Sequence, residues 1–364
     1  MVLHLNYSFI HIFPYEKFLI PFIDFINANF PSTQHMFYVW GKLDYLDLDL
    51  DVYNNIRHFP SKIKMLSNKD FQINLHSCNK IIVHSFLSNL IAFFLIPYLS
   101  KTTFIFWGHD IYELREPSKS LLSRFIRFVK LKIIEYADTI ATIIKGDYDL
   151  LCKYCNPRGT HSRAIYRNSN TKEMDKLLSK NFLKKPFQIL VGNSATSENR
   201  HIEIFRMLAR YKDESLFVIV PLSYGTKQYR AQVIDAGVKI LGDAFKPIID
   251  FMCENDYLEI LSQCSIGIFN TNRQQGIGNI LAMGYLGAKV YICNETVMWT
   301  EFVEECGMLF HDIKEISDQD YRQFAHITND ELETNRKLIG TYLSQESALS
   351  IWNNIFTFGN TRVM

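Results

Sequence analysis

Net charge and cysteine are both scarce in this sequence. Its 364 residues hold 39 Lys+Arg against 38 Asp+Glu, a formal net charge of +1, so no overall positive field would draw the chain to nucleic acid. The seven cysteines are odd in number, and the one closely spaced pair, Cys152 and Cys155, lacks the second pair of ligands that a zinc site needs. This usage is typical of reduced, buried thiols in a cytosolic protein.

Targeting and membrane-spanning signals are also missing. The segment from Met1 to Asn6 has no basic region followed by an apolar one, so we expect no secretory leader. Residues 81–99 carry no Asp, Glu, Lys or Arg and approach the ~20 residues of a membrane span. They contain His84 and Pro97, however, and divide into a short strand and a helix that Ser88 can cap. We therefore expect no transmembrane helix.

Short apolar segments alternate with longer amphipathic ones, which is typical of α/β domains with parallel sheets. The length suits two such domains. We predict a Rossmann-like domain over residues 1–160, an interdomain linker over 161–186, a second Rossmann-like domain over 187–340, and a C-terminal helix over 341–364 that crosses back to the first domain. Ligands of such doubly wound folds bind at the carboxyl ends of the strands, here in a cleft between the two sheets.

The apolar segments predict five strands in each domain. In the first they are Val2–Asn6, Met36–Trp40, Lys80–His84, Thr103–Trp107 and Thr139–Ile143, with helices that include Tyr15–Asn29 and Pro117–Tyr136. In the second they are Phe187–Val191, Leu216–Val220, Val238–Leu241, Ser265–Asn270 and Lys289–Cys293. The loops that follow these strands should carry the chemistry.

Two loops of the second domain have the composition of an anion-binding site. Gly192, Asn193 and Ser194 follow its first strand, where small and amide residues leave backbone N–H groups available before a helix N-terminus. Capping of that helix by a hydroxyl is the alternative. A second loop combines a forked cation with two glycines, which favours a phosphate or a sugar although it matches neither a Walker A motif nor G-x-G-x-x-G. Its residues are Arg273, Gln274, Gln275, Gly276 and Gly278.

A third loop, in the first domain, gathers candidate acid–base groups. Asp110 and Glu113 follow a predicted central strand, and His84 ends the neighbouring one. Any of these side chains could deprotonate an acceptor hydroxyl. Helix capping or a satisfied hydrogen bond is the alternative for each of them.

The segment after this loop predicts a basic amphipathic helix. Between residues 115 and 132 six cations and one acid alternate with leucine, isoleucine and phenylalanine. Such a helix can lie on anionic lipid, and packing on its own domain with a solvated basic face is the alternative. The cations expected at a membrane surface are Lys119, Arg124, Arg127 and Lys130.

Four segments together resemble one protein family. They are Phe106–Leu114 (FWGHDIYEL), Ile189–Ser194 (ILVGNS) with Asn199 and His201, Val220–Tyr224 (VPLSY) and Arg273–Gly278 (RQQGIG). The family is the TDP-N-acetylfucosamine:lipid II N-acetylfucosaminyltransferases, also called the 4-alpha-L-fucosyltransferase family or glycosyltransferase family 56. Glu295 and Trp299 match a further element of it. The resemblance is dense from about residue 80 to 310 and poor over roughly the first 75 residues.

The resemblance implies a GT-B glycosyltransferase with two Rossmann-like domains, an acceptor-binding one over residues 1–160 and a nucleotide-sugar-binding one over 187–340. It would move a 4-acetamido-4,6-dideoxyhexose from a TDP donor to a polyprenyl-diphosphate-linked saccharide, in the synthesis of enterobacterial common antigen or O-antigen. The enzyme would lie peripherally on the cytoplasmic face of the bacterial inner membrane. Divergence in the N-terminal region leaves the acceptor open, and the nucleotide base is inherited from the family.

We expect a metal-independent reaction without a cofactor. Arg273 and the N–H groups near Gln275–Gly278 and Gly192–Ser194 would stabilise the departing diphosphate. Asn199 belongs to the same donor site, Glu295 would bind the ribose hydroxyls and Tyr224 would contact the thymine or the sugar. Asp110 is the first candidate for the base, followed by Glu113 and His84. Sugar-nucleotide epimerisation or hydrolysis on the same scaffold, and a non-catalytic sugar-nucleotide- or lipid-binding protein, are the alternatives.

Overall fold

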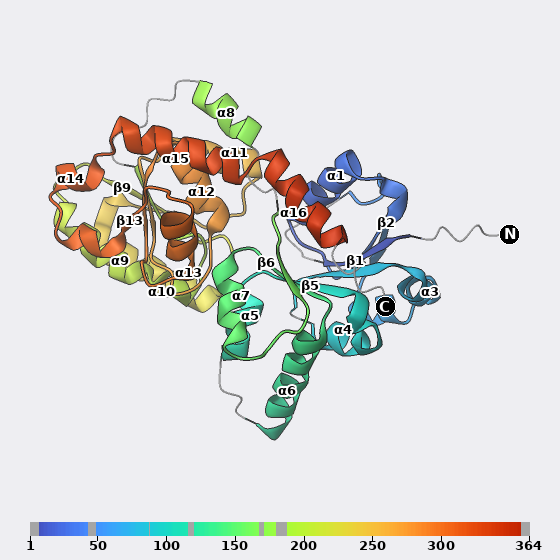
Figure 1. The fold of residues 1–364 in the computed structure, drawn as a ribbon. Coiled ribbons are helices and arrows are strands. Elements are labelled where there is room, and N and C mark those ends of the chain that lie inside the picture. Colours follow the sequence, from blue (N-terminus) through green and yellow to red (C-terminus); the bar gives the residue numbers. More distant parts are fainter. Residues whose placement is uncertain are drawn as a thin grey trace. The chain divides into compact units, whose positions relative to one another are not determined.

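The computed structural model describes residues 7–42, 49–86, 88–115, 120–166, 171–179 and 188–357. The chain divides into two compact units. The first comprises Met1–Asn168 together with Gln345–Met364, and the second comprises Ser169–Ser344. Each unit is built on a parallel sheet with helices packed against it (Figure 1).

The first unit holds a seven-stranded sheet in the order β3-β2-β1-β4-β5-β6-β7. The strands are β1 (Phe9–Pro14), β2 (His35–Trp40), β3 (Ile56–Phe59), β4 (Lys80–His84), β5 (Thr102–Phe106), β6 (Thr139–Thr142) and β7 (Thr160–Arg163). Every residue of β4, β5 and β6 is buried, as expected for a parallel sheet covered on both faces. Chain order reverses between β1 and β4, so the topological switch point of this sheet lies there.

Eight α-helices of the described residues belong to this unit. They are α1 (Leu19–Asn29), α2 (Lys62–Leu66), α3 (Lys69–Ser77), α4 (Asn89–Phe94), α5 (His109–Arg115), α6 (Leu121–Tyr136), α7 (Lys145–Cys152) and α16 (Gln345–Thr357). Helix α16 comes from the far end of the chain and is held by Trp352, whose buried indole donates to the Ile165 carbonyl at 3.0 Å. The C-terminal helix therefore completes the first unit.

The second unit holds a six-stranded sheet in the order β10-β9-β8-β11-β12-β13. The strands are β8 (Gln188–Val191), β9 (Phe217–Pro221), β10 (Phe245–Ile248), β11 (Ile266–Phe269), β12 (Lys289–Ile292) and β13 (His311–Asp312). The helices are α8 (Thr171–Ser179), α9 (His201–Leu208), α10 (Lys227–Leu241), α11 (Glu254–Gln263), α12 (Ile277–Tyr285), α13 (Val297–Trp299), α14 (Tyr321–Ala325) and α15 (Asn329–Tyr342). Its switch point lies between β8 and β11.

The observed elements correct several predicted boundaries. Val238–Leu241 is the end of α10 rather than a strand, because Gly237 lets the Phe245 ring pack against the helix and Gly242 ends it at a φ of 55°. Residues 161–186 are not simply a linker, since they include the end of β7, which pairs with β6, and helix α8. The predicted strand Val2–Asn6 lies outside the described residues. The first strand observed, β1, occupies residues that were not predicted to be a strand.

Residues 81–99 divide as expected into β4 and α4, and the Ser88 hydroxyl caps α4 by accepting from the Ile91 N–H at 3.4 Å. Among the described residues no helix is long and apolar enough to span a bilayer.

Candidate active site

The two loops predicted to bind an anion meet at the switch point of the second sheet. One follows β8 and the other follows β11, and these strands are neighbours. Gln275 joins the loops by donating from Nε2 to Ser194 Oγ at 2.8 Å, to Thr196 Oγ1 at 3.0 Å and to Asn193 Oδ1 at 3.1 Å. The Gln275 side chain is buried, and its amide nitrogen braces the two loops, whereas a direct contact with the donor stays a prediction.

Asn199 organises the loop after β8 from within. Its amide is fully buried, accepts the Asn193 N–H at 3.2 Å and donates to the Ser194 carbonyl at 3.0 Å. Gly192 begins this loop at a φ of 70°, and a Cβ there would lie 2.6 Å from His201 Nε2. Only glycine satisfies both conditions without displacing the histidine. Asn199 and Gly192 thus shape the loop that carries the Asn193 and Ser194 side chains.

Helix α12 presents an uncapped N-terminus at this place. Gly276 is its N-cap residue, has a φ of 71° and provides no side chain to accept from the first turn. Residues 276–279 are partly exposed. Free N–H groups and the helix dipole together favour an anion here, and Gly278 keeps the approach to the backbone open.

The charged side chains predicted for the donor site are paired with partners. Arg273 Nε donates to Glu198 Oε1 at 3.4 Å, and its Nη1 donates to the Gln274 carbonyl at 3.1 Å. Burial would raise the pKa of the Glu198 carboxyl, but a backbone N–H and the Arg273 guanidinium hold it below its usual value. Gln274 is buried beside this pair.

Glu295 and Tyr224 lie at the ends of the strands on either side. Glu295 follows β12, is largely exposed and pairs with Lys314 at 2.7 Å, and this contact lowers the pKa of its carboxyl. Tyr224 follows β9, is partly exposed, and its hydroxyl accepts from Asn193 Nδ2 at 3.1 Å. Ala195 donates its N–H to the Tyr224 carbonyl at 2.7 Å, so the loops after β8 and β9 are also joined.

Sequence reasoning missed a second brace at this switch point. Arg200 has a left-handed backbone with a φ of 46° and donates to the Asn270 carbonyl at 3.0 Å and to Asn270 Oδ1 at 2.7 Å. It fastens the segment before α9 to the end of β11. The signal in the sequence was the position of Arg200, directly after Asn199, which matches the family pattern.

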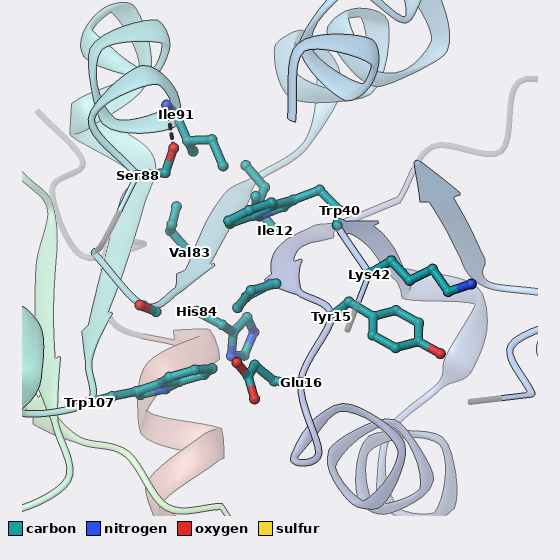
Figure 2. A pocket seen from close by; sticks show the side chains of 13 residues that line it. Ile12, Tyr15, Glu16, Trp40, Lys42, Val83, His84, Ser88, Ile91 and Trp107 are labelled. Atoms are coloured by element: carbon teal, nitrogen blue, oxygen red, sulfur yellow. Dashed lines mark hydrogen bonds between the residues drawn. The ribbon is translucent and has the colours of Figure 1, made fainter. Parts of the chain in front are cut away.

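The first unit carries a pocket of about 210 Å³ at its own switch point (Figure 2). Residues from the ends of β1, β2, β4 and β5 line it. Its walls are mainly apolar and aromatic, with Trp40, Trp107 and Val83 among them, and its polar groups include Glu16, Lys42 and His84. Ser85, also in the lining, has a φ of 77°, a backbone conformation that is uncommon outside glycine and frequent at functional sites.

Asp110, the first candidate for the base, is fully buried at the start of α5. One carboxylate oxygen accepts from the Phe86 N–H at 2.9 Å and the other from the Trp107 N–H at 3.0 Å. Burial raises the pKa of this carboxyl to about 6 even though these bonds oppose the shift. The observed bonds tie the ends of β4 and β5 together, and a role in deprotonation stays a prediction.

Glu113 and His84 also have protein partners. Glu113 is half-exposed and lies 3.4 Å from His109 and 4.0 Å from the Lys130 ammonium. His84 is buried, and both ring nitrogens face a partner, since Nε2 lies 3.0 Å from His11 Nδ1 and Nδ1 contacts the Tyr166 hydroxyl. A neutral imidazole with two such partners donates at one nitrogen and accepts at the other, so neither nitrogen is left to receive a substrate proton.

The His84 contacts continue into a buried chain of imidazoles. His11 Nε2 lies 2.9 Å from His35 Nδ1, so His35, His11, His84 and Tyr166 form one hydrogen-bonded row. Burial lowers the pKa of His35 to about 4, and it lowers the pKa values of His11 and His84 well below the usual range. The row therefore stays uncharged at neutral pH.

The predicted membrane helix is α6, and its exposed face differs from the expected one. Lys130 faces inward, over the Phe86 ring and beside Glu113, and Arg127 donates to the Leu114 carbonyl. The C-terminal half of α6 packs on the unit, where Lys130, Ile133 and Ile134 are buried. Lys119 lies outside the described residues. Of the other three cations predicted for the membrane surface, Arg124 is the one that is exposed. The strongly exposed apolar side chains are Leu121, Leu122, Phe125 and Phe128.

Solved structures with the same architecture show which fold this chain adopts. A Burkholderia multivorans trehalose 6-phosphate synthase is 10% identical with a TM-score of 0.63, over 97% of this chain and 98% of that one. A Thermosynechococcus elongatus sucrose-phosphate synthase is 12% identical with a TM-score of 0.62, over 96% of each chain. An E. coli trehalose-6-phosphate protein bound with UDP-2-fluoro glucose is 10% identical with a TM-score of 0.65, over 96% and 99%. The fold is the GT-B fold of glycosyltransferases.

The family follows from the sequence itself. The model of the 4-alpha-L-fucosyltransferases, glycosyl transferase group 56, matches residues 11–337, and the chain belongs to this family. The predicted fold class and family are thereby confirmed, and the protein is a hexosyltransferase. The match also extends over most of the N-terminal region in which the recognisable motifs were sparse.

Proposed function

We propose that this enzyme transfers a 4-acetamido-4,6-dideoxyhexose from a TDP donor to a polyprenyl-diphosphate-linked saccharide. The observation that carries the proposal is the uncapped N-terminus of α12, held by Gln275 against the Asn193–Ser194 loop. A diphosphate fits this arrangement because it is an anion whose oxygens can accept several backbone N–H bonds. Family membership supports the identity of the sugar, of the nucleotide base and of the lipid acceptor, and hence a place in enterobacterial common antigen or O-antigen synthesis.

The donor site would act on the leaving group. Negative charge accumulates on the departing diphosphate in the transition state, and donors fixed in place before the reaction stabilise it. Arg273 is positioned for this task by Glu198 and by the Gln274 carbonyl. In this proposal the arginine and the α12 N–H groups act without a metal ion, so activity should persist in EDTA.

The nucleoside would lie between the flanking strand ends. The Glu295 carboxylate is exposed and ionised, and it can accept from two ribose hydroxyls once it exchanges its Lys314 contact for them. The Tyr224 ring is fixed through its hydroxyl to Asn193 and can stack on thymine.

We also place the enzyme at the cytoplasmic face of the bacterial inner membrane. Helix α6 begins with two exposed leucines and continues with exposed Phe125 and Phe128, and Figure 1 shows it reaching away from the first sheet. Contiguous exposed apolar side chains with a neighbouring cation are typical of helices that lie in a lipid interface. A lipid-linked acceptor would be met at that surface.

The test is an acceptor-dependent transfer assay with TDP-4-acetamido-4,6-dideoxygalactose and a synthetic polyprenyl-diphosphate saccharide, read by mass spectrometry. A UDP-hexose and the donor without acceptor are the parallel reactions. We expect product only with the TDP sugar and acceptor together. Rapid consumption of donor without acceptor would favour the hydrolase or epimerase, and nucleotide binding without any turnover would favour a non-catalytic binding protein.

A further inference from the structure

The pocket of the first unit lies where the chain order of its parallel strands reverses, between β1 and β4, and the residues that follow β1 line it. Tyr15 and Glu16 come directly after β1, whereas Ser85 and Ser88 follow the neighbouring β4. Doubly wound sheets bind their ligands at this position. The loop predicted to hold the base follows β5. Its first residue, Trp107, lines the pocket, whereas Asp110 and Glu113 are not among the lining residues.

The lining contains few groups that could accept a proton. Lys42 is a cation, and both nitrogens of His84 are already hydrogen-bonded within the protein. Tyr15 is a buried phenol. Among the described lining residues Glu16 is the one carboxylate. In Figure 2 its carboxylate is turned towards the side of the pocket that His84 and Trp107 occupy.

We propose that the Glu16 carboxylate is the catalytic base that takes the proton from the acceptor hydroxyl, an inference that rests on the glycosyl transfer proposed above. The hydroxyl proton passes to a Glu16 oxygen as the acceptor oxygen forms its bond to the anomeric carbon. The bond from that carbon to the diphosphate breaks, and its electron pair leaves with the nucleotide. Glu16 later releases the proton to solvent.

The surroundings of Glu16 suit a base that works near neutral pH. Burial raises the pKa of its carboxyl, and this effect outweighs the charge and backbone hydrogen bond of the adjacent Lys17, which lower it. The other titratable groups in the lining are Tyr15 beside it, Lys42 after β2 and His84 on β4. The His84 row is uncharged, so it fixes one wall of the pocket without adding charge to it. Trp40 and Trp107 offer flat faces of the kind on which a sugar ring packs.

The experiment compares Glu16→Gln and Glu16→Asp with wild type in transfer assays across pH. Loss of a general base costs typically 10²–10⁴-fold, so Glu16→Gln should lower kcat by about that factor. The acidic limb of the pH–rate profile should disappear in Glu16→Gln, and Glu16→Asp should restore part of the rate together with the limb. Affinity for dTDP, a ligand of the second unit, should stay unchanged. Asp70→Asn, an exposed carboxylate of α3, is the matched control.

Two outcomes overturn the inference. One is a Glu16→Gln enzyme whose kcat stays within about threefold of wild type, and the other is an acidic limb that survives the substitution. A measurement without substrate distinguishes a wrong assignment of the base from a wrong choice of donor or acceptor. The Glu16 carboxyl, assigned in NMR titrations by its loss in Glu16→Gln, should titrate above the usual glutamate value of about 4.3. Titration at or below that value would also overturn the inference, whereas an inactive wild type would count against the proposed substrates.

Discussion

The Gln275 amide donates to Ser194 Oγ across 2.8 Å and so connects two loops that are 81 residues apart in sequence. The same nitrogen lies within hydrogen-bond distance of Asn193 and Thr196. Glutamine at this position therefore sets the separation between the β8 loop and the N-terminus of α12. Donor affinity should depend on this side chain even though it is buried.

Gln275→Ala tests that dependence. Each net hydrogen bond is worth about 0.5–1.5 kcal/mol, so losing the brace should loosen the loop and weaken dTDP binding by roughly tenfold, or about 1.4 kcal/mol. Isothermal titration calorimetry measures the change. Gln232→Ala, on the exposed face of α10, should leave the affinity as it is. If the two variants bound dTDP with equal affinity, Gln275 would not contribute to the donor site.

Gly276→Ala separates backbone strain from contact with the neighbouring loop. Gly276 and Gly307 have nearly the same φ, 71° and 72°, but a Cβ at Gly276 would lie 3.2 Å from Asn193 Cγ, whereas one at Gly307 meets nothing within 4 Å. Both alanines should lower the free energy of unfolding by about 1–2 kcal/mol through the left-handed backbone. Only Gly276→Ala should also weaken dTDP binding. Thermal melts with and without dTDP distinguish the two effects.

Arg273→Ala should lower turnover by roughly a hundredfold or more. A preorganised donor aimed at developing negative charge lowers the barrier by about 3–4 kcal/mol, and each 1.4 kcal/mol is tenfold in rate. The fall should appear in kcat more than in KM because the charge develops in the transition state. Arg206→Ala, an exposed cation of α9, is the control. Near-normal turnover in Arg273→Ala would show that the arginine does not act on the phosphates.

The donor loops could be predicted from the sequence because each is a polar, glycine-containing turn directly after an apolar strand. Gly192 and Gly276 mark backbone conformations that few other residues adopt. The sequence did not indicate, however, that Asn199 and Gln275 bond to the loops themselves. The sequence of an amide residue is the same whether its side chain binds a ligand or a neighbouring loop. Only the pairing of β8 with β11, which brings the two loops together, distinguishes the two roles.

The acceptor side was harder to predict, and β1 is the reason. Its apolar run continues into the aromatic residues of α1 with little change in pattern, so no period marks the boundary. His11, in the middle of the strand, is buried between His35 and His84, which come from the neighbouring strands β2 and β4, 24 and 73 residues further along the chain. Because no strand was predicted at Phe9–Pro14, the sequence did not show that Glu16 follows a strand at the switch point. Asp110 was singled out because it follows a predicted central strand, but its carboxylate accepts from main-chain N–H groups.

The buried histidines predict that stability falls in mild acid. Burial lowers the pKa of His35 and of His201 to about 4, whereas the same side chains titrate near 6.5 when unfolded. Between pH 6.5 and 4 the unfolded chain binds protons that the native state excludes, so the free energy of unfolding decreases as pH falls through this window. Each such imidazole contributes a slope of about 1.4 kcal/mol per pH unit.

Urea titrations at several pH values measure that slope. His201→Leu should reduce it by the share of one imidazole, whereas His326→Asn, an exposed histidine, should leave it unchanged. A free energy of unfolding that is constant from pH 7 to pH 4.5 would contradict the neutral, buried state of the row His35–His11–His84.

Apolar contact, more than charge, should hold α6 on a bilayer. Among the described residues of this helix the inward direction of Lys130 and the bonding of Arg127 leave fewer exposed cations than the sequence indicates. Full burial of a leucine or phenylalanine side chain is worth about 1.5–3 kcal/mol. Replacing Leu121, Phe125 and Phe128 by serine should therefore lower vesicle binding by more than tenfold. Arg124→Gln should reduce only the part of binding that anionic lipid adds.

Co-sedimentation with neutral and anionic vesicles, at low and high salt, distinguishes the two contributions. Wild type should remain partly bound at high salt because screening weakens the charge attraction and leaves burial of the apolar face intact. Val238→Ser removes an apolar side chain of similar exposure from α10, in the other unit, and should have no effect. Complete release of wild type by salt would show that charge attraction holds the protein on vesicles. Binding that is unaffected by the triple substitution would show that α6 does not contact the membrane.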